Sequence, residues 1–434
     1  MIRDPEHEQM PRKELEQFQL ERLRAKVKLV YEKVPFYHRT FQERGIRLDH
    51  LNTISDLTKL PFTSKLDFKD NYPLGLMAVP LEQVVRIHSS SGTTDKPTIA
   101  PYTQGDINTW AEILARALVT AGVTRKDIVQ NAFGYGLFTG GLGFHYGVER
   151  LGATVIPTAT GNTKRQINLL QDLGTTVLAC TPSYALIISE AAQEMGVDLR
   201  KTRLRLTISG AEPSSEQMRK DIEERLGVQV LNDYGLTEAM GPGVSIECPY
   251  QCGMHIPEDH FLVEIIDPET GEQLPYGDEG ELVLTTLTKE AYPVIRFRTR
   301  DITSLNPEPC KCGRTLVRMS RVTGRTDDML VVRGVNVFPS QIENVLLEIE
   351  GVEPHYTIVV DRKTAFSCSD MEIWIEVNDN IFSDEMHKME NLEKRIRSEL
   401  ESTLGISTRI RLVEPRTIAR SEGKSKRVLD RSEL

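Results

Sequence analysis

The sequence predicts an α/β fold, with a large N-terminal domain of layered β-sheets and helices and a small α+β C-terminal domain. Two observations lead to this prediction. Up to about Gly324, short apolar runs rich in β-formers alternate with helical patterns, which is typical of α/β layers. Beyond Asp328 the pattern changes to a compact set of helices and strands. We therefore expect domains at residues 1–326 and 327–434 of this 434-residue chain.

The elements of the first domain follow from hydrophobic periodicity. Residues 106–121 carry the pattern of an amphipathic helix. Strands are expected where short apolar runs contain many β-branched residues, at 176–180, 204–210, 228–235 and 280–287.

The second domain carries its own helices and strands. Pro339 is expected to open a helix, because apolar residues follow it at helical spacing up to Ile349. A longer helix with apolar residues from Met386 to Leu404 ends at Gly405. The remaining apolar runs predict strands at 357–360, at 371–377 and around 410–412.

Charge and hydropathy exclude several classes of protein. Asp and Glu outnumber Lys and Arg by 63 to 53, so the net charge of −10 offers no general attraction to nucleic acid or to anionic lipid. No apolar window is long enough to span a membrane, and the charged N-terminus lacks the apolar segment of a secretory signal. We expect a cytoplasmic protein with small-molecule ligands, without nucleic-acid or membrane partners; a homodimer is left open.

Residues 89–98, SSSGTTDKPT, have the composition of a phosphate-binding loop. Backbone N–H groups and short hydroxyl side chains can converge on phosphate oxygens, glycine permits close approach, and lysine neutralises charge. The candidates are Ser90, Ser91, Gly92, Thr93, Thr94 and Lys96. The alternative is a polar surface turn. Asp95 opposes phosphate binding by its charge, so we expect it to point away from the phosphates.

A second segment, NDYGLTEA at 232–239, follows a predicted strand directly. Open α/β sheets bind ligands at the carboxyl ends of their strands. Tyr234 could stack on a base, Thr237 could contact a phosphate or acyl oxygen, and Glu238 could coordinate Mg²⁺. The alternative is a turn with a solvated glutamate.

Two short loops contain five metal-ligating residues, Cys248, Cys252, His255, Cys310 and Cys312. Thiolates and imidazole are the ligands that Zn²⁺ prefers, and four of them suffice for a closed structural site. The alternative is reduced cysteines without a metal, because the CxxxC and CxC spacings depart from the commonest zinc patterns.

These segments occur in the order seen in a known superfamily, together with RFRTRDI at 296–302, GRTDDMLVVRGVNVFPSQIE at 324–343 and SEGKSKRV at 421–428. The chain resembles the adenylate-forming enzymes, which include acyl-CoA synthetases, adenylation domains and luciferase. Within them it is most similar to the phenylacetate-CoA ligase family, because of YGLFTGGLGFHYG, LTTLTKEAYPVIRFRTRD and RGVNVFPSQIE.

The resemblance implies an AMP-forming acid–thiol ligase of the phenylacetate-CoA ligase type. Such an enzyme uses ATP and Mg²⁺ to convert a phenylacetate-like aryl acid into an acyl-AMP with release of pyrophosphate, and then transfers the acyl group to CoA. A second interpretation keeps the adenylation but delivers the acyl group to a carrier protein or an amine. A third, an inactive nucleotide-binding relative, is disfavoured because Glu238, Asp301, Asp327 and Lys424 are all present.

The resemblance also implies roles for matching residues in the first reaction. Lys424 would reach the carboxylate and the α-phosphate, with Lys426 and Arg427 as competitors for that role. Glu238 would hold Mg²⁺ and Thr237 would contact the phosphate. The loop from Ser90 to Lys96 would bind the ATP phosphates. The adenine would be lined by Ser209, Gly210, Ala211, Glu212, Pro213, Asp233, Tyr234 and Gly235, while Asp301 would accept the ribose hydroxyls with Arg325 nearby.

The remaining implied roles concern the acid, CoA and zinc. Tyr135, Phe138, Gly140 and Gly141 would form an aromatic wall with space for a flat ring, although the same residues could simply pack a sheet–helix junction. Asp327 would be the hinge of a mobile C-terminal domain, and Gly334 would leave room for the pantetheine arm of CoA. The resemblance favours Cys248, His255, Cys310 and Cys312 as zinc ligands, with Cys252 as a substitute.

Overall fold

The computed structural model describes residues 1–47, 50–90, 97–328, 330–333, 335–362, 367–378, 386–420 and 427–431. The chain forms two compact units. The first comprises Met1–Cys180, Asp198–Ala211 and Val228–Arg321, and the second comprises Thr181–Val197, Glu212–Gly227 and Val322–Leu434. The second unit thus joins two earlier segments to the C-terminal part, which the sequence pattern does not predict.

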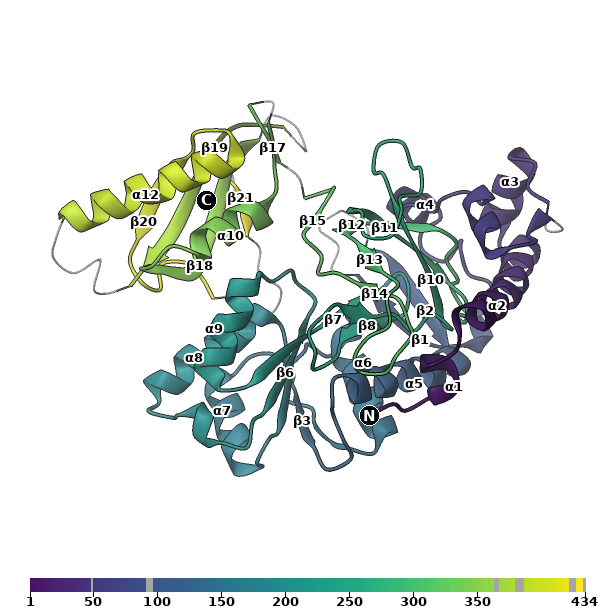
Figure 1. The fold of residues 1–434 in the computed structure, drawn as a ribbon, viewed down its shortest axis with the longest axis horizontal. Coiled ribbons are helices and arrows are strands. Elements are labelled where there is room, and N and C mark those ends of the chain that lie inside the picture. The colour runs from purple at the N-terminus through teal and green to yellow at the C-terminus, as the bar shows by residue number, and fades with distance from the viewer. Residues whose placement is uncertain are drawn as a thin grey trace. The chain divides into compact units, whose positions relative to one another are not determined.

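A nine-stranded sheet forms the centre of the first unit (Figure 1). Its order is β13-β14-β9-β8-β7-β6-β5-β3-β4, and the strands from β4 to β7 run parallel. The predicted strands at 176–180, 204–210 and 228–235 are confirmed as β5, β6 and β7. The bounds are β3 (Ile128–Asn131), β4 (Thr154–Ile156), β5 (Val177–Cys180), β6 (Leu206–Gly210), β7 (Gln229–Leu236), β8 (Gly241–Glu247), β9 (Met254–His255), β13 (Leu305–Asn306) and β14 (Arg318–Met319).

Two smaller sets of antiparallel strands complete the β-structure of this unit. One is the pair β1 (Val84–Ser89) and β2 (Ile99–Thr103), and the other contains β10 (Phe261–Ile266), β11 (Gly280–Thr286) and β12 (Phe297–Thr303). The strand predicted at 280–287 is β11.

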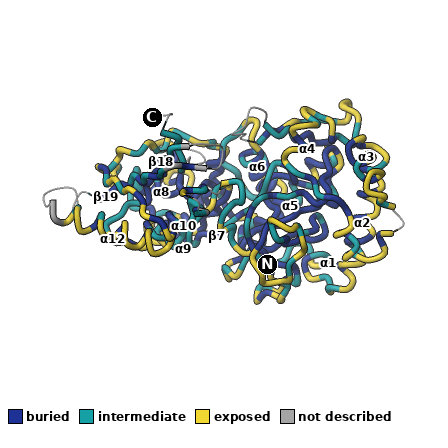
Figure 2. Tube along the Cα trace, turned by 90° about the horizontal axis from the view of Figure 1, so that it is seen from above, coloured by how far each residue is buried: buried dark blue, intermediate teal, exposed yellow. Residues whose placement is uncertain are grey.

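The helices of the first unit cover its sheets. Their bounds are α1 (Pro5–Glu8), α2 (Arg12–Lys33), α3 (Pro35–Glu43), α4 (Lys65–Asp70), α5 (Gln104–Thr120), α6 (Thr139–Leu151), α7 (Thr163–Asp172) and the short η2 (Ile54–Lys59), η3 (Leu81–Gln83) and η4 (Leu199–Lys201). A capping box of Thr103 and Asp106 begins α5. This helix packs against α6 and β8, and most of it is buried (Figure 2).

The second unit contains a mixed sheet of the order β17-β16-β19-β18-β21, with β20 paired to β19. Its strands are β15 (Gly324–Arg325), β16 (Leu330–Val332), β17 (Val335–Val337), β18 (Val352–Arg362), β19 (Ser367–Val377), β20 (Arg409–Val413) and β21 (Val428–Asp430), and its helices are α8 (Pro182–Glu194), α9 (Glu216–Leu226), α10 (Pro339–Leu347) and α12 (Met386–Leu404). Apolar side chains of α10, α12 and the sheet form one core, as their periodicity predicts.

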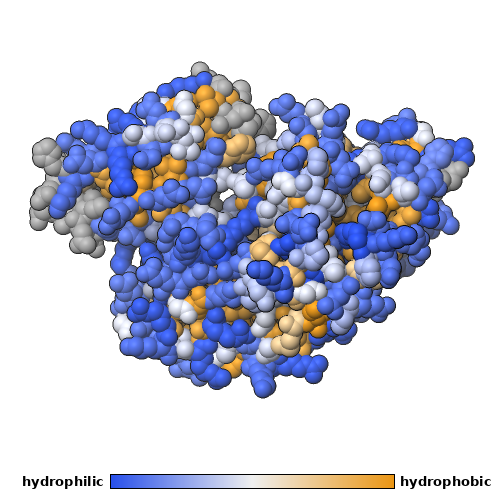
Figure 3. All heavy atoms as spheres, viewed as in Figure 1, coloured by the Kyte–Doolittle hydropathy of each residue, from blue (hydrophilic) through white to orange (hydrophobic). Residues whose placement is uncertain are grey.

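The α/β class is therefore confirmed. On the face shown in Figure 3, hydrophobic residues lie in separate groups among hydrophilic ones. Among the described residues, no helix combines the length and the apolar character that crossing a membrane requires.

Candidate functional site

The candidate nucleotide residues of the first unit lie where two parallel strands end side by side. Ser209 and Gly210 are the last residues of β6, and Gly210 pairs with Asp233 of β7. A Cβ on Gly210 would lie 2.4 Å from the Asp233 carbonyl oxygen, so this close approach requires glycine. Ala211 follows in a left-handed conformation with φ of 71°. This is the position at which open α/β sheets bind ligands.

Ser209 and Asp233 differ in how their polar atoms are used. The Ser209 hydroxyl is fully buried and has no hydrogen-bond partner among the described residues. Asp233 accepts a hydrogen bond from the Gly243 N–H at 3.1 Å, and burial raises the pKa of its carboxyl well above the usual range. Asp233 therefore stabilises the loop after β7.

Tyr234 and Asp301, which the resemblance places near the adenine and the ribose, contact each other. The Tyr234 hydroxyl donates to Asp301 Oδ2 at 2.6 Å. Asp301 is a buried residue of β12, and its N–H donates to Thr299 Oγ1. Gly235 is required by packing, because a Cβ there would lie 2.1 Å from the Gly241 carbonyl oxygen. The sequence does not predict the Tyr234–Asp301 hydrogen bond.

The turn after β7 carries Thr237 and Glu238. Glu238 is buried, whereas Thr237 is half-buried. Two buried aromatic side chains hold the backbone that follows: the Tyr102 hydroxyl donates to the Met240 carbonyl oxygen at 2.9 Å, and Trp110 Nε1 donates to that of Pro242 at 3.1 Å. Sequence reasoning missed both aromatic residues because each lies far from this turn along the chain.

Ser90 closes the β1–β2 pair at the start of the predicted phosphate loop. Its N–H donates to the Thr98 carbonyl oxygen at 2.9 Å, and its hydroxyl accepts from the Thr98 N–H at 3.0 Å. The loop residues Ser91, Gly92, Thr93, Thr94, Asp95 and Lys96, together with Gly334, Lys424 and Lys426, lie outside the described residues.

The acid-side segment combines an anchored tyrosine with an exposed phenylalanine. The Tyr135 hydroxyl accepts from Asn131 Nδ2 at 2.8 Å, and burial raises its pKa to about 12. The Phe138 side chain is half exposed. A Cβ on Gly141 would lie 2.5 Å from the Gly134 carbonyl oxygen, whereas one on Gly140 would make only ordinary contacts. Gly141 is thus needed for packing at the start of α6.

In the second unit, Glu212 and Arg325 have partners of their own. Glu212 Oε1 accepts a hydrogen bond from the Ser183 N–H at 2.7 Å, at the N-terminus of α8. Pro213 follows Glu212. Arg325 forms a bidentate ion pair with Asp327, with N–O distances of 2.9 and 3.0 Å.

Arg427, one of the two competitors of Lys424, also has an assigned place in the second unit. Its guanidinium carbon lies 4.4 Å from the centroid of the Tyr356 ring, and its carbonyl oxygen accepts from the Ile358 N–H at 2.7 Å. These contacts are those of a packing residue.

The cysteine-rich loops form one cluster. Cys248, His255, Cys310 and Cys312 offer ligand atoms that all lie within 4.8 Å of one another. Cys310 Sγ is 3.7 Å from Cys248 Sγ, and Cys312 Sγ is 3.4 Å from His255 Nε2. Cys252 is exposed, with its Sγ 3.4 Å from that of Cys310. The hydrogen bond between Cys248 and Cys312 lowers the pKa of the Cys312 thiol and raises that of Cys248, so it favours a thiolate at Cys312.

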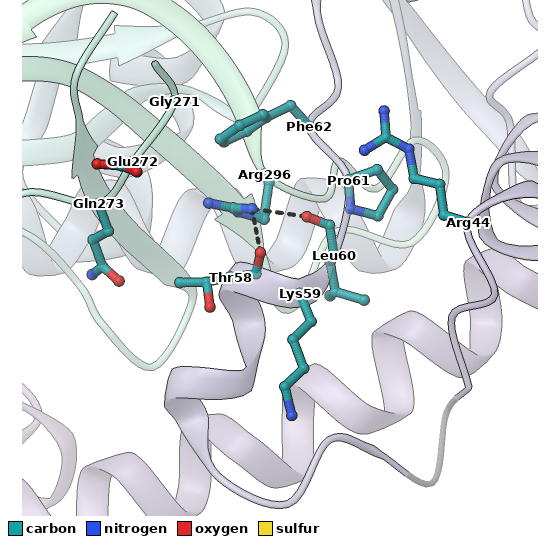
Figure 4. A pocket seen from close by; sticks show the side chains of 10 residues that line it. All are labelled: Arg44, Thr58, Lys59, Leu60, Pro61, Phe62, Gly271, Glu272, Gln273 and Arg296. Carbon is teal, nitrogen blue, oxygen red and sulfur yellow. Dashed lines mark hydrogen bonds between the residues drawn. The ribbon is translucent and has the colours of Figure 1, made fainter.

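The first unit also contains a cavity of about 460 Å³ that is separate from the candidate site residues (Figure 4). Its lining includes Phe62 and Arg296, and none of the predicted site residues. The Arg296 guanidinium donates to the carbonyl oxygens of Thr58 and Leu60 (Figure 4). It also pairs with Glu264. Because these partners use its donors, Arg296 offers little to a ligand.

Two sequence families match the chain. Residues 8–287 match the family described as AMP-binding enzyme, and residues 334–432 match the AMP-binding enzyme C-terminal domain. The chain is 47% identical to a phenylacetate-coenzyme A ligase of Thermus thermophilus over 99% of both proteins. It is 48% identical to that of Escherichia coli, over 96% of this chain and 95% of the relative.

Solved structures agree with these matches. A 2-hydroxyisobutyryl-CoA ligase in its postadenylation state, bound to an acyl-AMP, has a TM-score of 0.92 at 27% identity, over 99% of this chain and 92% of that chain. The same enzyme with 2-HIB-AMP and CoA in its thioesterification state has a TM-score of 0.73 at 28% identity, over 98% and 91%. The chain therefore belongs to the phenylacetate-CoA ligase family of adenylate-forming enzymes and is an ATP-dependent, AMP-forming acid-CoA ligase.

Proposed function

We propose that this enzyme activates phenylacetate or a closely related aryl acid. The observation that carries the proposal is the near full-length identity of 47–48% to several proteins that are all phenylacetate-coenzyme A ligases. The half-exposed Phe138 and the anchored Tyr135 supply aromatic surface next to the start of α6, which suits a flat ring.

The first reaction must bring a carboxylate to the α-phosphate of ATP although both are negative. Lys424 supplies positive charge at the reacting oxygens, and Glu238 holds Mg²⁺, with Thr237 on the phosphate. The buried carboxylate of Glu238 at a strand end fits such a metal, which neutralises phosphate charge when it is bound. The packing role of Arg427 against Tyr356 favours Lys424 over this competitor.

For the nucleotide, the buried Ser209 hydroxyl, which has no partner within the described part of the chain, and the strand-end backbone at Gly210 and Ala211 support an adenine site. Tyr234 orients Asp301 for the ribose hydroxyls through its hydrogen bond. Asp233 acts indirectly: it stabilises the loop after β7 by accepting a hydrogen bond from the Gly243 N–H.

For the second reaction, the domain beginning at residue 327 rotates about Asp327, so that Lys424 leaves and the segment with Gly334 admits the pantetheine arm. The bidentate pair of Arg325 and Asp327 defines one geometry of this hinge. The thiolate of CoA then attacks the acyl carbon and AMP leaves.

We assign the cluster of Cys248, His255, Cys310 and Cys312 to one structural Zn²⁺. Three sulfur donors and one imidazole within 4.8 Å fit the tetrahedral preference of zinc, and four protein ligands leave no open position for chemistry. Cys252 is the adjacent substitute. The cytoplasmic location and the homodimer stay predictions.

Acid-dependent pyrophosphate release, measured across aryl, indolyl and aliphatic acids, tests the substrate class. We expect the highest kcat/KM with phenylacetate and only background release without an acid. A preference for aliphatic acids would contradict the proposal. CoA-dependent release of AMP separates this function from transfer to a carrier protein or an amine.

A further inference from the structure

Four buried side chains meet in the first unit and have no role in the proposed chemistry. Tyr102 stacks on Trp110 with ring centroids 5.2 Å apart, and the His88 ring stands edge-on to both, at 5.3 and 5.7 Å. Lys289 Nζ lies 3.5 Å from the centroid of the Tyr102 ring. We call His88, Tyr102, Trp110 and Lys289 the aromatic platform.

The platform holds the turn that follows Glu238. Tyr102 and Trp110 donate to the carbonyl oxygens of Met240 and Pro242. Between them, Gly241 has φ of 107°, and a Cβ there would lie 2.5 Å from the Trp110 ring. The backbone after Glu238 is thus fixed by two hydrogen bonds and pressed against an indole ring.

The same platform joins the acid-side segment to the start of the phosphate loop. His88 Nδ1 donates to the Leu137 carbonyl oxygen at 3.0 Å, and the next residue, Ser89, donates its N–H to the same oxygen at 2.9 Å. Leu137 precedes Phe138, and Ser89 precedes Ser90.

Lys289 is held so that its ammonium faces the tyrosine ring. The side chain is fully buried, and Nζ has no hydrogen-bond partner within the part of the chain that the structure describes. The backbone at this position is also held. The Lys289 carbonyl oxygen accepts a hydrogen bond from Lys26 Nζ, and the N–H of the next residue, Glu290, donates to Asp106. A buried cation over a ring face is favourable and restrains the ring.

We propose that the aromatic platform is a positioning unit of the ligase: Tyr102 and Trp110 set the turn that carries Glu238, and His88 aligns the acid-side segment with the end of β1 at Ser89. The inference rests on the proposed function of Glu238 and deepens it. Its physical basis is preorganisation, since a carboxylate on a fixed turn does not have to be ordered when the metal and ATP bind.

The first test replaces Tyr102→Phe, which removes one hydroxyl and keeps the ring. The Mg²⁺ concentration for half-maximal pyrophosphate release should rise about fivefold, the size of one lost neutral hydrogen bond, while the KM of the acid stays within about twofold. Tyr37→Phe is the control for a lost buried hydroxyl, because the Tyr37 hydroxyl hydrogen-bonds Thr63 Oγ1 and accepts from the Ile295 N–H, away from the turn. It should lower stability and leave the Mg²⁺ dependence unchanged.

Glu238→Gln, measured alongside, tests the Mg²⁺ role of Glu238 separately from the positioning role of the aromatic platform. If it shifts the Mg²⁺ dependence while Tyr102→Phe behaves like Tyr37→Phe, only the platform inference is overturned. If Glu238→Gln keeps the wild-type dependence, the metal assignment is wrong and the inference built on it falls as well.

His88 provides the second test. His88→Leu removes the donor to Leu137 and should raise the KM of the acid about fivefold, the loss expected for one neutral hydrogen bond. His88→Asn keeps an N–H donor and should restore the KM to within about twofold of wild type. Equal KM values for the two variants would overturn the role of His88.

Discussion

Tyr234→Phe tests whether Asp301 is oriented for the nucleotide by its neighbour. The substitution removes the hydroxyl that donates to Asp301 Oδ2 at 2.6 Å and leaves the aromatic ring in place. Asp301 itself stays buried in β12. The change therefore removes the hydrogen bond from the Tyr234 hydroxyl to the Asp301 carboxylate.

The size of the effect follows from the nature of that hydrogen bond. Hydrogen bonds to charged groups contribute about 1.5–3 kcal/mol, and the partly exposed Tyr234 places this one near the lower end. Since about 1.4 kcal/mol corresponds to a factor of ten, the KM of ATP should rise about tenfold. The kcat should change less than about threefold, because the role we propose for Asp301 is to hold the ribose, away from the reacting atoms.

Initial rates of pyrophosphate release at varied ATP concentration measure both constants, and Tyr37→Phe again serves as the control for a lost buried hydroxyl. The Tm of both variants shows how much each substitution lowers the stability of the fold. An unchanged KM of ATP together with a lowered Tm would refute the orienting role and leave the Tyr234–Asp301 pair as a purely structural contact.

The remaining predictions concern the two half-reactions, the metal and pH. Lys424→Ala should nearly abolish pyrophosphate formation and spare CoA transfer from pre-made acyl-AMP; equal loss of both would rule out two conformations. Asp327→Pro should damage thioester formation more than adenylation through its fixed φ, and equal effects on both would remove the hinge role. Elemental analysis should find about one Zn²⁺ per chain. Cys310→Ser should lose both the zinc and stability, whereas Cys180→Ala should keep the zinc because its thiol lies outside the cluster. Wild-type protein without zinc would contradict the assignment. Burial lowers the pKa of His260 to about 4, so the contribution of this residue to the free energy of unfolding should fall by up to about 3 kcal/mol as pH drops from 6.5 towards 4. The difference in free energy of unfolding between wild type and His260→Gln should change by this amount over that range; identical pH profiles would contradict it.

Local patterns predicted much of the framework. The strands that became β5, β6 and β7 could be recognised from short β-branched runs, because side-chain burial on a parallel sheet leaves a continuous apolar signal. The two short loops predicted five candidate zinc ligands, and the four that the resemblance favoured lie within 4.8 Å of one another.

Contacts between distant segments could not be predicted in this way. Tyr102 and Trp110 hold Met240 and Pro242 across more than a hundred residues, and no periodicity reports such a pairing. Glu212 was assigned to the adenine by resemblance, yet one of its oxygens accepts from the N-terminus of α8. The packing role of Gly141 likewise depends on the backbone of Gly134, which only the folded chain brings close.

Oxygen-18 in the carboxylate of phenylacetate tests whether the acid is activated as an acyl-AMP. If the carboxylate attacks the α-phosphate and CoA then displaces AMP, one labelled oxygen must leave with AMP. Mass spectrometry of the products should therefore find one oxygen-18 in AMP and none in pyrophosphate. Label in pyrophosphate or phosphate, or unlabelled AMP beside the thioester, would contradict the adenylate mechanism.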